Sequence, residues 1–206
     1  MKLRTATATL AATATLLTGC GGGETGEPTT GGPTAIGPTA ENGPTTRASE
    51  VTAPTVSDPI EGIDKYKQDP CSMLTKAQAT KLGYSAEIKR PPDQDNGPEC
   101  EWLDEDTNSF TIVILNNQPE GMAGVYKNKE YFGYFEPVNV AGYPGVFGGA
   151  VDDREDGACS LGVGVTDQQV INIGGQMNLG SPDRNRPCEV MKKAAEMAIK
   201  TMRTGK

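Results

Sequence analysis

Residues 158–177, ACSLGVGVTDQQVINIGGQM, decide how the rest of this chain can fold. Two runs of strand-like composition, 158–166 and 169–177, flank the dipeptide Asp167-Gln168. Such runs around a two-residue connection are typical of a β-hairpin. The second half of the chain is therefore expected to contribute antiparallel strands.

Three more runs of the sequence have the composition of strands. CEWLDED at 100–106 and SFTIVILNN at 109–117 are expected to be two strands joined by a tight acidic turn, because TIVIL is rich in β-branched residues. VNVAGY at 138–143 is expected to be another strand. Together with the hairpin, these runs predict an antiparallel sheet of about five strands.

Helical patterns lie before, between and after these strands. Segment 75–83 begins with the Thr-x-x-Gln spacing of a capping box and ends at a glycine, so it predicts a short helix. A second short helix is expected at 121–132. The C-terminal segment 188–204 has the apolar stripe of an amphipathic helix, formed by Met191, Ala195, Ala198 and Met202.

The order of these elements indicates the class of fold. Helix, two strands, helix, three strands and helix predict an α+β domain, with an antiparallel sheet and helices on one face. Residues 60–206 are close to the commonest size of one domain with its own core. We expect a single globular α+β domain there, without an internal repeat.

The N-terminus has the composition of a bacterial export signal. Lys2 and Arg4 precede an uncharged stretch of Ala, Thr and Leu, the order of a secretory signal. Residues 17–20, LTGC, resemble the lipobox at which lipoproteins are lipidated on cysteine and cut before it. An uncharged stretch of about 15 residues is too short to span a bilayer, which needs about 20. We expect residues 1–19 to be a signal peptide and Cys20 to carry a lipid that holds the protein at the extracytoplasmic face of the cell membrane. The alternatives are an ordinary secretory signal with a chance cysteine and a short membrane anchor.

The segment 20–59 is expected to be a disordered linker, because Gly, Pro and Thr dominate it and no apolar run is long enough to bury. As a flexible coil it would hold the domain roughly 35 to 40 Å from the membrane on average. Removal of residues 1–19 takes away Lys2 and Arg4, which leaves 17 basic against 27 acidic residues, a net charge of −10. Phosphate backbones repel such a surface, so nucleic acid is not an expected partner.

The four cysteines beyond Cys20 predict two disulfides, as is usual for an exported protein. No C-x-x-C spacing and no histidine occur, which argues against zinc. Cys71 and Cys188 each follow a proline and open a helix, and the starts of two helices that pack side by side can meet. Cys100 and Cys159 lie on expected strands. The expected pairing is therefore Cys71 with Cys188 and Cys100 with Cys159. The alternative, Cys71 with Cys100 and Cys159 with Cys188, would fasten each half of the domain locally.

Several short motifs resemble those of one known family. They are Asp69-Pro70-Cys71 before the capped helix ending Leu82-Gly83, Cys100-x-Trp102, an apolar strand with Cys159, and Pro187-Cys188 opening the last helix. In this order behind a lipobox, they resemble the actinobacterial lipoproteins with domain of unknown function three-five-five-eight. The resemblance covers about residues 69–202. It implies an architecture and a location, and no established activity.

The sequence lacks the common catalytic and cofactor-binding motifs. Without histidine, Ser-His-Asp and Cys-His nucleophile systems cannot form. Nucleotide-binding glycine motifs are also missing. Asp104, Asp106 and Asn108 match the first ligand positions of a calcium loop, but Ser109 replaces its glycine and Leu115 its final glutamate. No cofactor or metal is expected.

The aromatic residues are concentrated in one region. Seven of the eleven lie between residues 126 and 147, and adjacent aromatic pairs cannot all face one core. An exposed tyrosine-rich patch can stack on sugars or anchor a protein partner. The alternative is that these rings fill the core. The candidate binding patch consists of Tyr126, Tyr131, Tyr134 and Tyr143.

Two functions therefore remain open. The first is a non-catalytic, lipid-anchored binding module that contacts an envelope component or another protein. The second is a carboxylate-dependent hydrolase acting on wall polymer, which would need two or more carboxylates converging in a pocket. The acidic stretch DDREDG at 152–157 is expected to be a solvated loop. The absence of a catalytic constellation favours binding.

Overall fold

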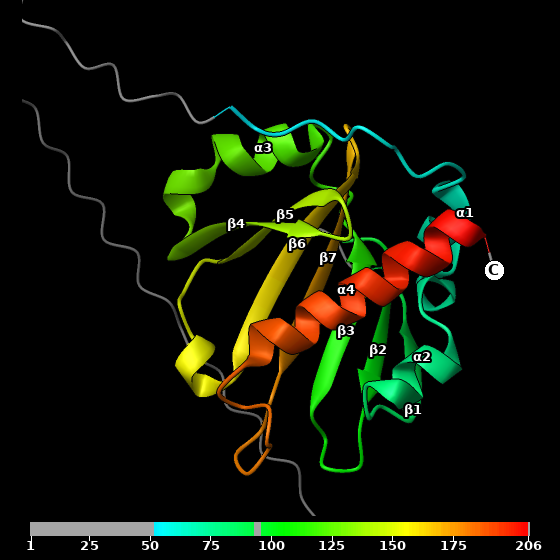
Figure 1. Cartoon of the computed structure of the whole chain (residues 1–206), viewed down its shortest axis with the longest axis vertical. Helices are drawn as coiled ribbons and strands as arrows, with labels where there is room; N and C mark the ends of the chain where they lie inside the picture. Colours follow the sequence, from blue (N-terminus) through cyan, green and yellow to red (C-terminus); the bar gives the residue numbers. More distant parts are fainter. Residues whose placement is uncertain (1–51, 93–95, 206) are drawn as a thin grey trace, which may run out of the picture. The chain divides into compact units, whose positions relative to one another are not determined.

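The computed structural model describes residues 52–92 and 96–205. They form an antiparallel sheet with helices packed against it (Figure 1). The strand order is β1-β2-β3-β7-β6-β5-β4. The strands are β1 Ala86–Arg90, β2 Glu99–Leu103, β3 Ser109–Ile114, β4 Tyr134–Val140, β5 Tyr143–Gly149, β6 Ala158–Thr166 and β7 Gln169–Gln176. The α-helices are α1 Asp64–Gln68, α2 Lys76–Lys81, α3 Gly121–Lys127 and α4 Pro187–Thr204.

The hairpin at 158–177 is confirmed and lies in the middle of the sheet. β6 pairs with β7 from Ala158 opposite Gln176 to Thr166 opposite Gln169. β3 flanks the hairpin on the β7 side and β5 flanks it on the β6 side. The strands expected at 100–106 and 109–117 are confirmed as β2 and β3.

The sheet has seven strands, not the five or so expected. Segment 138–143 contains a turn between two strands, because Ala141 and Gly142 adopt φ values of 54° and 94° and reverse the chain. Positive φ at both central residues is what a tight hairpin turn requires. The other unexpected strand, β1, reads AEIKR and is largely exposed, so it has no clear apolar alternation to identify it.

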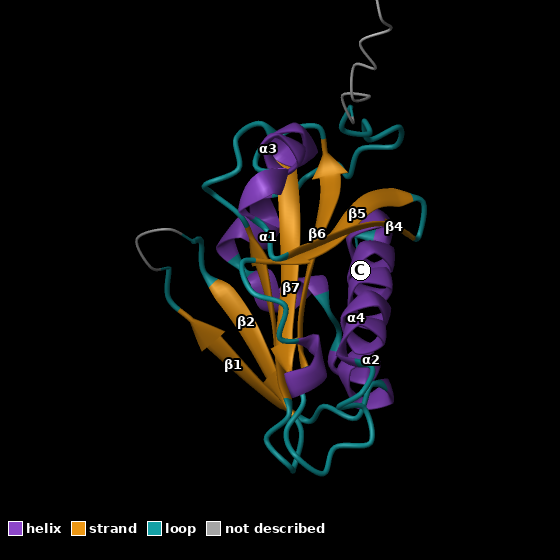
Figure 2. Cartoon of the chain, turned by 90° about the vertical axis from the view of Figure 1, so that its left-hand side faces the viewer, coloured by secondary structure: helices purple, strands orange, loops and turns teal. Residues whose placement is uncertain are grey.

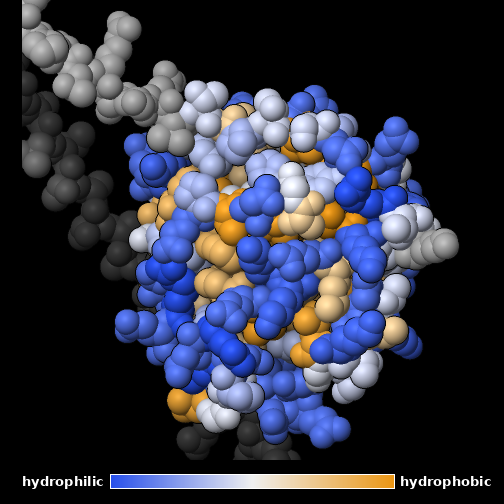
Figure 3. Space-filling view, viewed as in Figure 1, coloured by the Kyte–Doolittle hydropathy of each residue, from blue (hydrophilic) through white to orange (hydrophobic). Residues whose placement is uncertain are grey.

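Helix α4 covers one face of the sheet. Its apolar stripe is buried as expected, and it packs on β6 and β7. The helix approaches the sheet closely at Gly175, where an added Cβ would lie 2.6 Å from Cε of Met191. The view of Figure 3 shows that the outward face of this helix is hydrophilic. The sheet and α4 therefore enclose the main core.

Helix α3 packs on the opposite face, so the expectation that all helices share one face was wrong. Met122 and Val125 of α3 form a second hydrophobic cluster with Val146 and Val170. Val170 points away from the main core because its neighbour Ile171 points into it, and strand side chains alternate between faces. Figure 2 shows α4 along one side of the strands and α3 toward the other.

The disulfides join Cys71 with Cys100 and Cys159 with Cys188. The expected pairing of Cys71 with Cys188 was wrong, because α2 packs beside the second half of α4. The Gln78 side chain donates from Nε2 to the Met197 carbonyl at 3.0 Å. Met197 lies nine positions after Cys188, which is about 14 Å along a helix. Each half of the domain is therefore fastened locally.

The entry segment, which we define as residues 52–60, packs against the domain. Val56 and Ile60 are buried. The Val56 amide donates to Oδ1 of Asp167 at 2.9 Å, and the Ile60 amide donates to the Val165 carbonyl at 2.9 Å. Packing thus begins before residue 60, where the domain was expected to start. Cys20, the expected signal peptide and the linker up to residue 51 lie outside the described residues.

Candidate functional site

The structure does not bring the four candidate tyrosines together. Tyr131 is 73% exposed and Tyr126 is half-buried, whereas Tyr134 and Tyr143 are only 7% and 3% exposed. Tyr134 and Tyr143 each begin a strand, and both side chains turn inward there. The expected patch of four tyrosines was therefore wrong for these two residues.

The aromatic residues near α3 pack mainly on one another. The Tyr126 ring meets the Phe135 ring edge-on at 5.1 Å, and Phe132 meets Phe135 at 5.5 Å. These rings are half-buried against the cluster under α3. Among the described rings of this region only Tyr131 is exposed, so they form no continuous tyrosine surface.

The two candidate tyrosines that are buried, Tyr134 and Tyr143, differ in whether their hydroxyl groups have hydrogen-bond partners. The Tyr134 hydroxyl accepts a hydrogen bond from the Ser160 amide at 3.2 Å. The Arg154 guanidinium stacks over the same ring at 4.3 Å and also binds Asp152 and Glu136 at 2.7 Å each. Both the hydroxyl and the ring of Tyr134 therefore have partners inside the domain.

The Tyr143 hydroxyl, in contrast, has no hydrogen-bond partner among the described residues. Buried polar groups are nearly always paired, so an unpaired hydroxyl needs an explanation. Trp102 also has a buried, unpaired Nε1 in the described part of the chain, and both residues belong to the main core. Tyr143 differs because it lines a pocket of about 260 Å³.

This pocket lies between the entry segment and the end of α4, and we call it the Tyr143 pocket. It is lined by Asp58, Pro59, Ile60, Glu61, Tyr143, Met202 and Arg203. Arg203 donates from Nη2 to Oδ2 of Asp58 at 2.8 Å, and both side chains are more than half exposed. Burial raises the pKa of Tyr143, and the Asp58 charge raises it further while Arg203 lowers it. The phenol therefore lies within electrostatic reach of this ion pair.

A second hollow also has Arg203 among its lining residues. It measures about 310 Å³ and is lined by Ala141, Glu196, Ile199, Lys200, Arg203 and Thr204. Ala141 lies in the turn that places Tyr143, with its φ of 54° in the left-handed region. Left-handed backbone at a non-glycine residue is uncommon and often accompanies function. Arg203 thus borders two hollows at one end of the domain.

A larger hollow in the described structure, about 730 Å³, lies at the start of α4. Asp152, Arg154, Glu155, Arg186 and Glu189 are among its lining residues. Its two arginines are already paired, Arg154 with Asp152 and Arg186 with Asp183. The Arg154 hydrogen bonds also lower the pKa of Asp152. Among the described residues, no side chain with an unpaired buried polar atom lines this hollow, so it is the weaker candidate.

The acidic residues that resembled a calcium loop hold the β2–β3 turn. Oδ1 of Asp104 accepts hydrogen bonds from the amides of Asp106 and Asn108, both at 2.9 Å. Its Oδ2 accepts from Nδ2 of Asn108 at 2.7 Å. Asp104 therefore stabilises the β2–β3 turn, as Asp side chains commonly do by accepting hydrogen bonds from nearby backbone amides.

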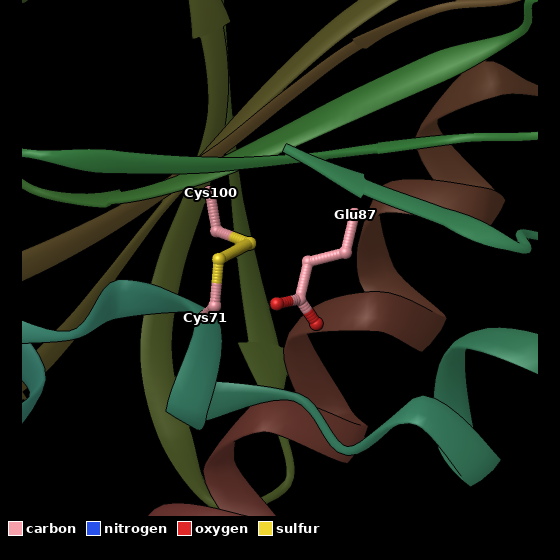
Figure 4. Close-up of side chains that lie close together, drawn as sticks. All are labelled: Cys71, Glu87 and Cys100. Atoms are coloured by element: carbon pink, nitrogen blue, oxygen red, sulfur yellow. A yellow bond between two sulfur atoms is a disulfide. The ribbon is translucent and has the colours of Figure 1, made fainter. Parts of the chain in front are cut away.

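One group of side chains in the described ranges has the proximity of metal ligands. It consists of Cys71, Glu87 and Cys100 (Figure 4). The two sulfur atoms are joined in a disulfide, and a metal needs thiolates. Glu87 points toward this disulfide. The group is therefore a structural disulfide with a carboxylate beside it.

Sequence reasoning missed the Tyr143 pocket for a physical reason. Asp58 and Arg203 are 145 positions apart, and neither belongs to a recognisable motif. Arg203 lies in the last turn of α4, where the helix dipole favours basic residues, so its presence there did not indicate a site. The one available signal was the aromatic cluster, which included Tyr143 for a different reason.

The fold and the site define a class: a disulfide-stapled α+β domain with an antiparallel seven-stranded sheet and a polar pocket at one end. The chain belongs to the family described as "Protein of unknown function (DUF3558)", whose model matches residues 15–201. No curated protein and no solved structure matches this chain. No helix in the described ranges is long and apolar enough to cross a membrane.

Proposed function

We propose that this protein is a lipid-anchored, extracytoplasmic binding module of the bacterial cell envelope. The lipobox-like LTGC at 17–20, with its charged and then apolar approach, supports anchoring through Cys20. The Gly, Pro and Thr content of the following segment supports a long flexible connection. Loss of palmitate labelling in Cys20→Ala is expected, and equal labelling would contradict the anchor.

One observation carries the binding role: the buried, unpaired Tyr143 hydroxyl in a pocket that also contains charged groups. A phenol donates and accepts one hydrogen bond readily, a guanidinium only donates and carboxylates only accept. Asp58, Glu61, Arg203 and Tyr143 therefore offer both donors and acceptors within one small space. A small shift of the side chains that now cover the hydroxyl would let a bound molecule satisfy the phenol that the protein leaves unsatisfied.

These groups favour a neutral, hydroxyl-rich ligand, such as a sugar. Each hydroxyl can donate to a carboxylate and accept from Arg203 or Tyr143. An anion would meet two carboxylates, Asp58 and Glu61, against one guanidinium. The second hollow beside Arg203 suits a neighbouring unit of the same ligand. We therefore propose that the ligand is an oligosaccharide segment of an envelope polymer.

The arrangement of the carboxylates in the Tyr143 pocket favours binding over hydrolysis. A glycosidase needs two carboxylates placed on either side of the bond to be cut, one of them as proton donor. Asp58 is bound instead by Arg203 at 2.8 Å. The pocket thus contains a ligand-orienting ion pair and a phenol.

The ligand class is tested by titrating the full chain in detergent with neutral malto- and chito-oligosaccharides and with an anionic oligogalacturonate. We expect saturable binding of a neutral probe and none of the anion. Binding of the anion alone would contradict the ligand class. Shortened products, detected by chromatography, would instead support the hydrolase.

A further inference from the structure

The two edges of the sheet are built differently. β4 forms one edge and carries Pro137 at its centre, which has no amide hydrogen to offer to another strand. β1 forms the other edge, contains no proline, and pairs only with β2 among the described strands (Figure 2). The outer edge of β1 therefore presents free backbone donors and acceptors.

The sequence of β1 is complementary to itself when two copies run antiparallel. With Ile88 opposite Ile88 of a second copy, Glu87 lies opposite Lys89, and Lys89 lies opposite Glu87. Opposite charges in directly facing positions stabilise a strand pair, and like charges destabilise it. This register therefore gives two favourable charge pairs and one apolar pair.

Exposure of the side chains fits the same register. Ile88 is 41% exposed, one of four large hydrophobic residues exposed in the described parts of the chain. Lys89 binds Oδ1 of Asp69 at 2.7 Å, yet its side chain remains 63% exposed. An ammonium has three donors, so Lys89 can bind a second carboxylate while it keeps the first.

We infer that two copies of this protein associate through their β1 strands and join their sheets into one. The two-fold axis passes beside Ile88, so each copy contributes the same surface. Backbone hydrogen bonds between the strands supply the contact, and Glu87 and Lys89 fix the register. Two chains held at one membrane surface meet at a raised local concentration, which favours this pairing.

Reversal of single charges tests this inference in the full chain, measured by native mass spectrometry from detergent micelles. Glu87→Lys places lysine opposite lysine, and Lys89→Glu places glutamate opposite glutamate. We expect the parent to dimerise and each variant alone to dimerise at least roughly tenfold more weakly. A parent that stays monomeric, or single variants that dimerise as well as the parent, would overturn the inference.

A mixture of the two variants provides the matched control. Their charges are opposite at both facing positions, so we expect mixed dimers to form as readily as parent dimers. Absence of mixed dimers would overturn the proposed register. Ile88→Lys, at an exposed position, serves as a third variant in case a charge reversal impairs folding, and it should also be monomeric. Dimerisation of Ile88→Lys at parent strength would count against the interface.

Discussion

Arg203, near the end of the last helix, binds Asp58 of the entry segment at 2.8 Å. The pair connects the two ends of the folded domain beside the Tyr143 hydroxyl, which has no partner of its own in the described structure. Such an arrangement is costly for a purely structural site, because a buried hydroxyl without a partner loses its hydration without compensation. We interpret it as a site kept for a ligand.

Removal of the unpaired hydroxyl should stabilise the protein. We expect Tyr143→Phe to raise the free energy of unfolding by about 1 kcal/mol, since it removes a desolvated polar group and keeps the ring. Urea unfolding measures the change. Tyr134→Phe is the matched control, and it should lower stability by about 1 kcal/mol because it leaves the Ser160 amide unpaired. Destabilisation by both variants would mean that the Tyr143 hydroxyl has a partner.

The difference in stability between Tyr143→Phe and the parent should depend on pH in the alkaline range. Burial raises the pKa of Tyr143 above its ordinary value of 10.0. Above that pH the unfolded chain loses this proton while the folded chain retains it, so the folded state becomes less stable as pH rises. The stability advantage of Tyr143→Phe should therefore be larger near pH 11 than near pH 8. An advantage that stays constant over this range would contradict the assignment.

Loss of either disulfide should have a similar effect, because both bonds join residues 29 positions apart. The loop-entropy model gives about 3 to 4 kcal/mol for a loop of this length. We expect Cys71→Ala with Cys100→Ala, and separately Cys159→Ala with Cys188→Ala, to lower the free energy of unfolding by that amount. Non-reducing peptide mapping provides the control. A peptide joining Cys71 to Cys188 would contradict the observed pairing.

Close packing of α4 on the sheet predicts different results for two adjacent glycines. Gly175→Ala would place a Cβ 2.6 Å from both the Met191 side chain and the Ser109 carbonyl oxygen. We expect a loss of roughly 1 to 3 kcal/mol, as for other overpacked cores. Gly174→Ala meets nothing closer than 3.5 Å and should change stability by less than about 0.5 kcal/mol. Equal effects in thermal melts would mean that α4 does not approach the sheet at this point.

The sequence predicted best where pattern and local chemistry agree. The hairpin at 158–177 and the capped helix beginning at Thr75 depend on neighbouring residues, and both were found as expected. Strand β1 was missed because an exposed edge strand has no buried face to create alternation. The sequence predicts one strand at 138–143, whereas the chain turns at Ala141, because alanine seldom adopts positive φ and so gives no turn signal.

Features that depend on distant parts of the chain could not be predicted. The disulfide pairing required knowledge of which end of α4 lies beside α2, and no local pattern contains it. The face covered by α3 depended on which side of β7 holds Val170. The pocket required Asp58, Tyr143 and Arg203 to meet from three separate segments. Only the concentration of aromatic residues directed attention to Tyr143, and its actual environment differs from the exposed patch expected.

The central claim is that the Tyr143 hydroxyl belongs to a binding site for a neutral, hydroxyl-rich ligand. The most direct measurement is calorimetric titration of the full chain and its Tyr143→Phe and Tyr134→Phe variants with the neutral oligosaccharide that binds the parent. We predict that Tyr143→Phe binds at least roughly tenfold more weakly although it is more stable, and that Tyr134→Phe binds like the parent. Equal affinity of Tyr143→Phe and the parent, or no binding of any neutral probe by the parent, would contradict the account.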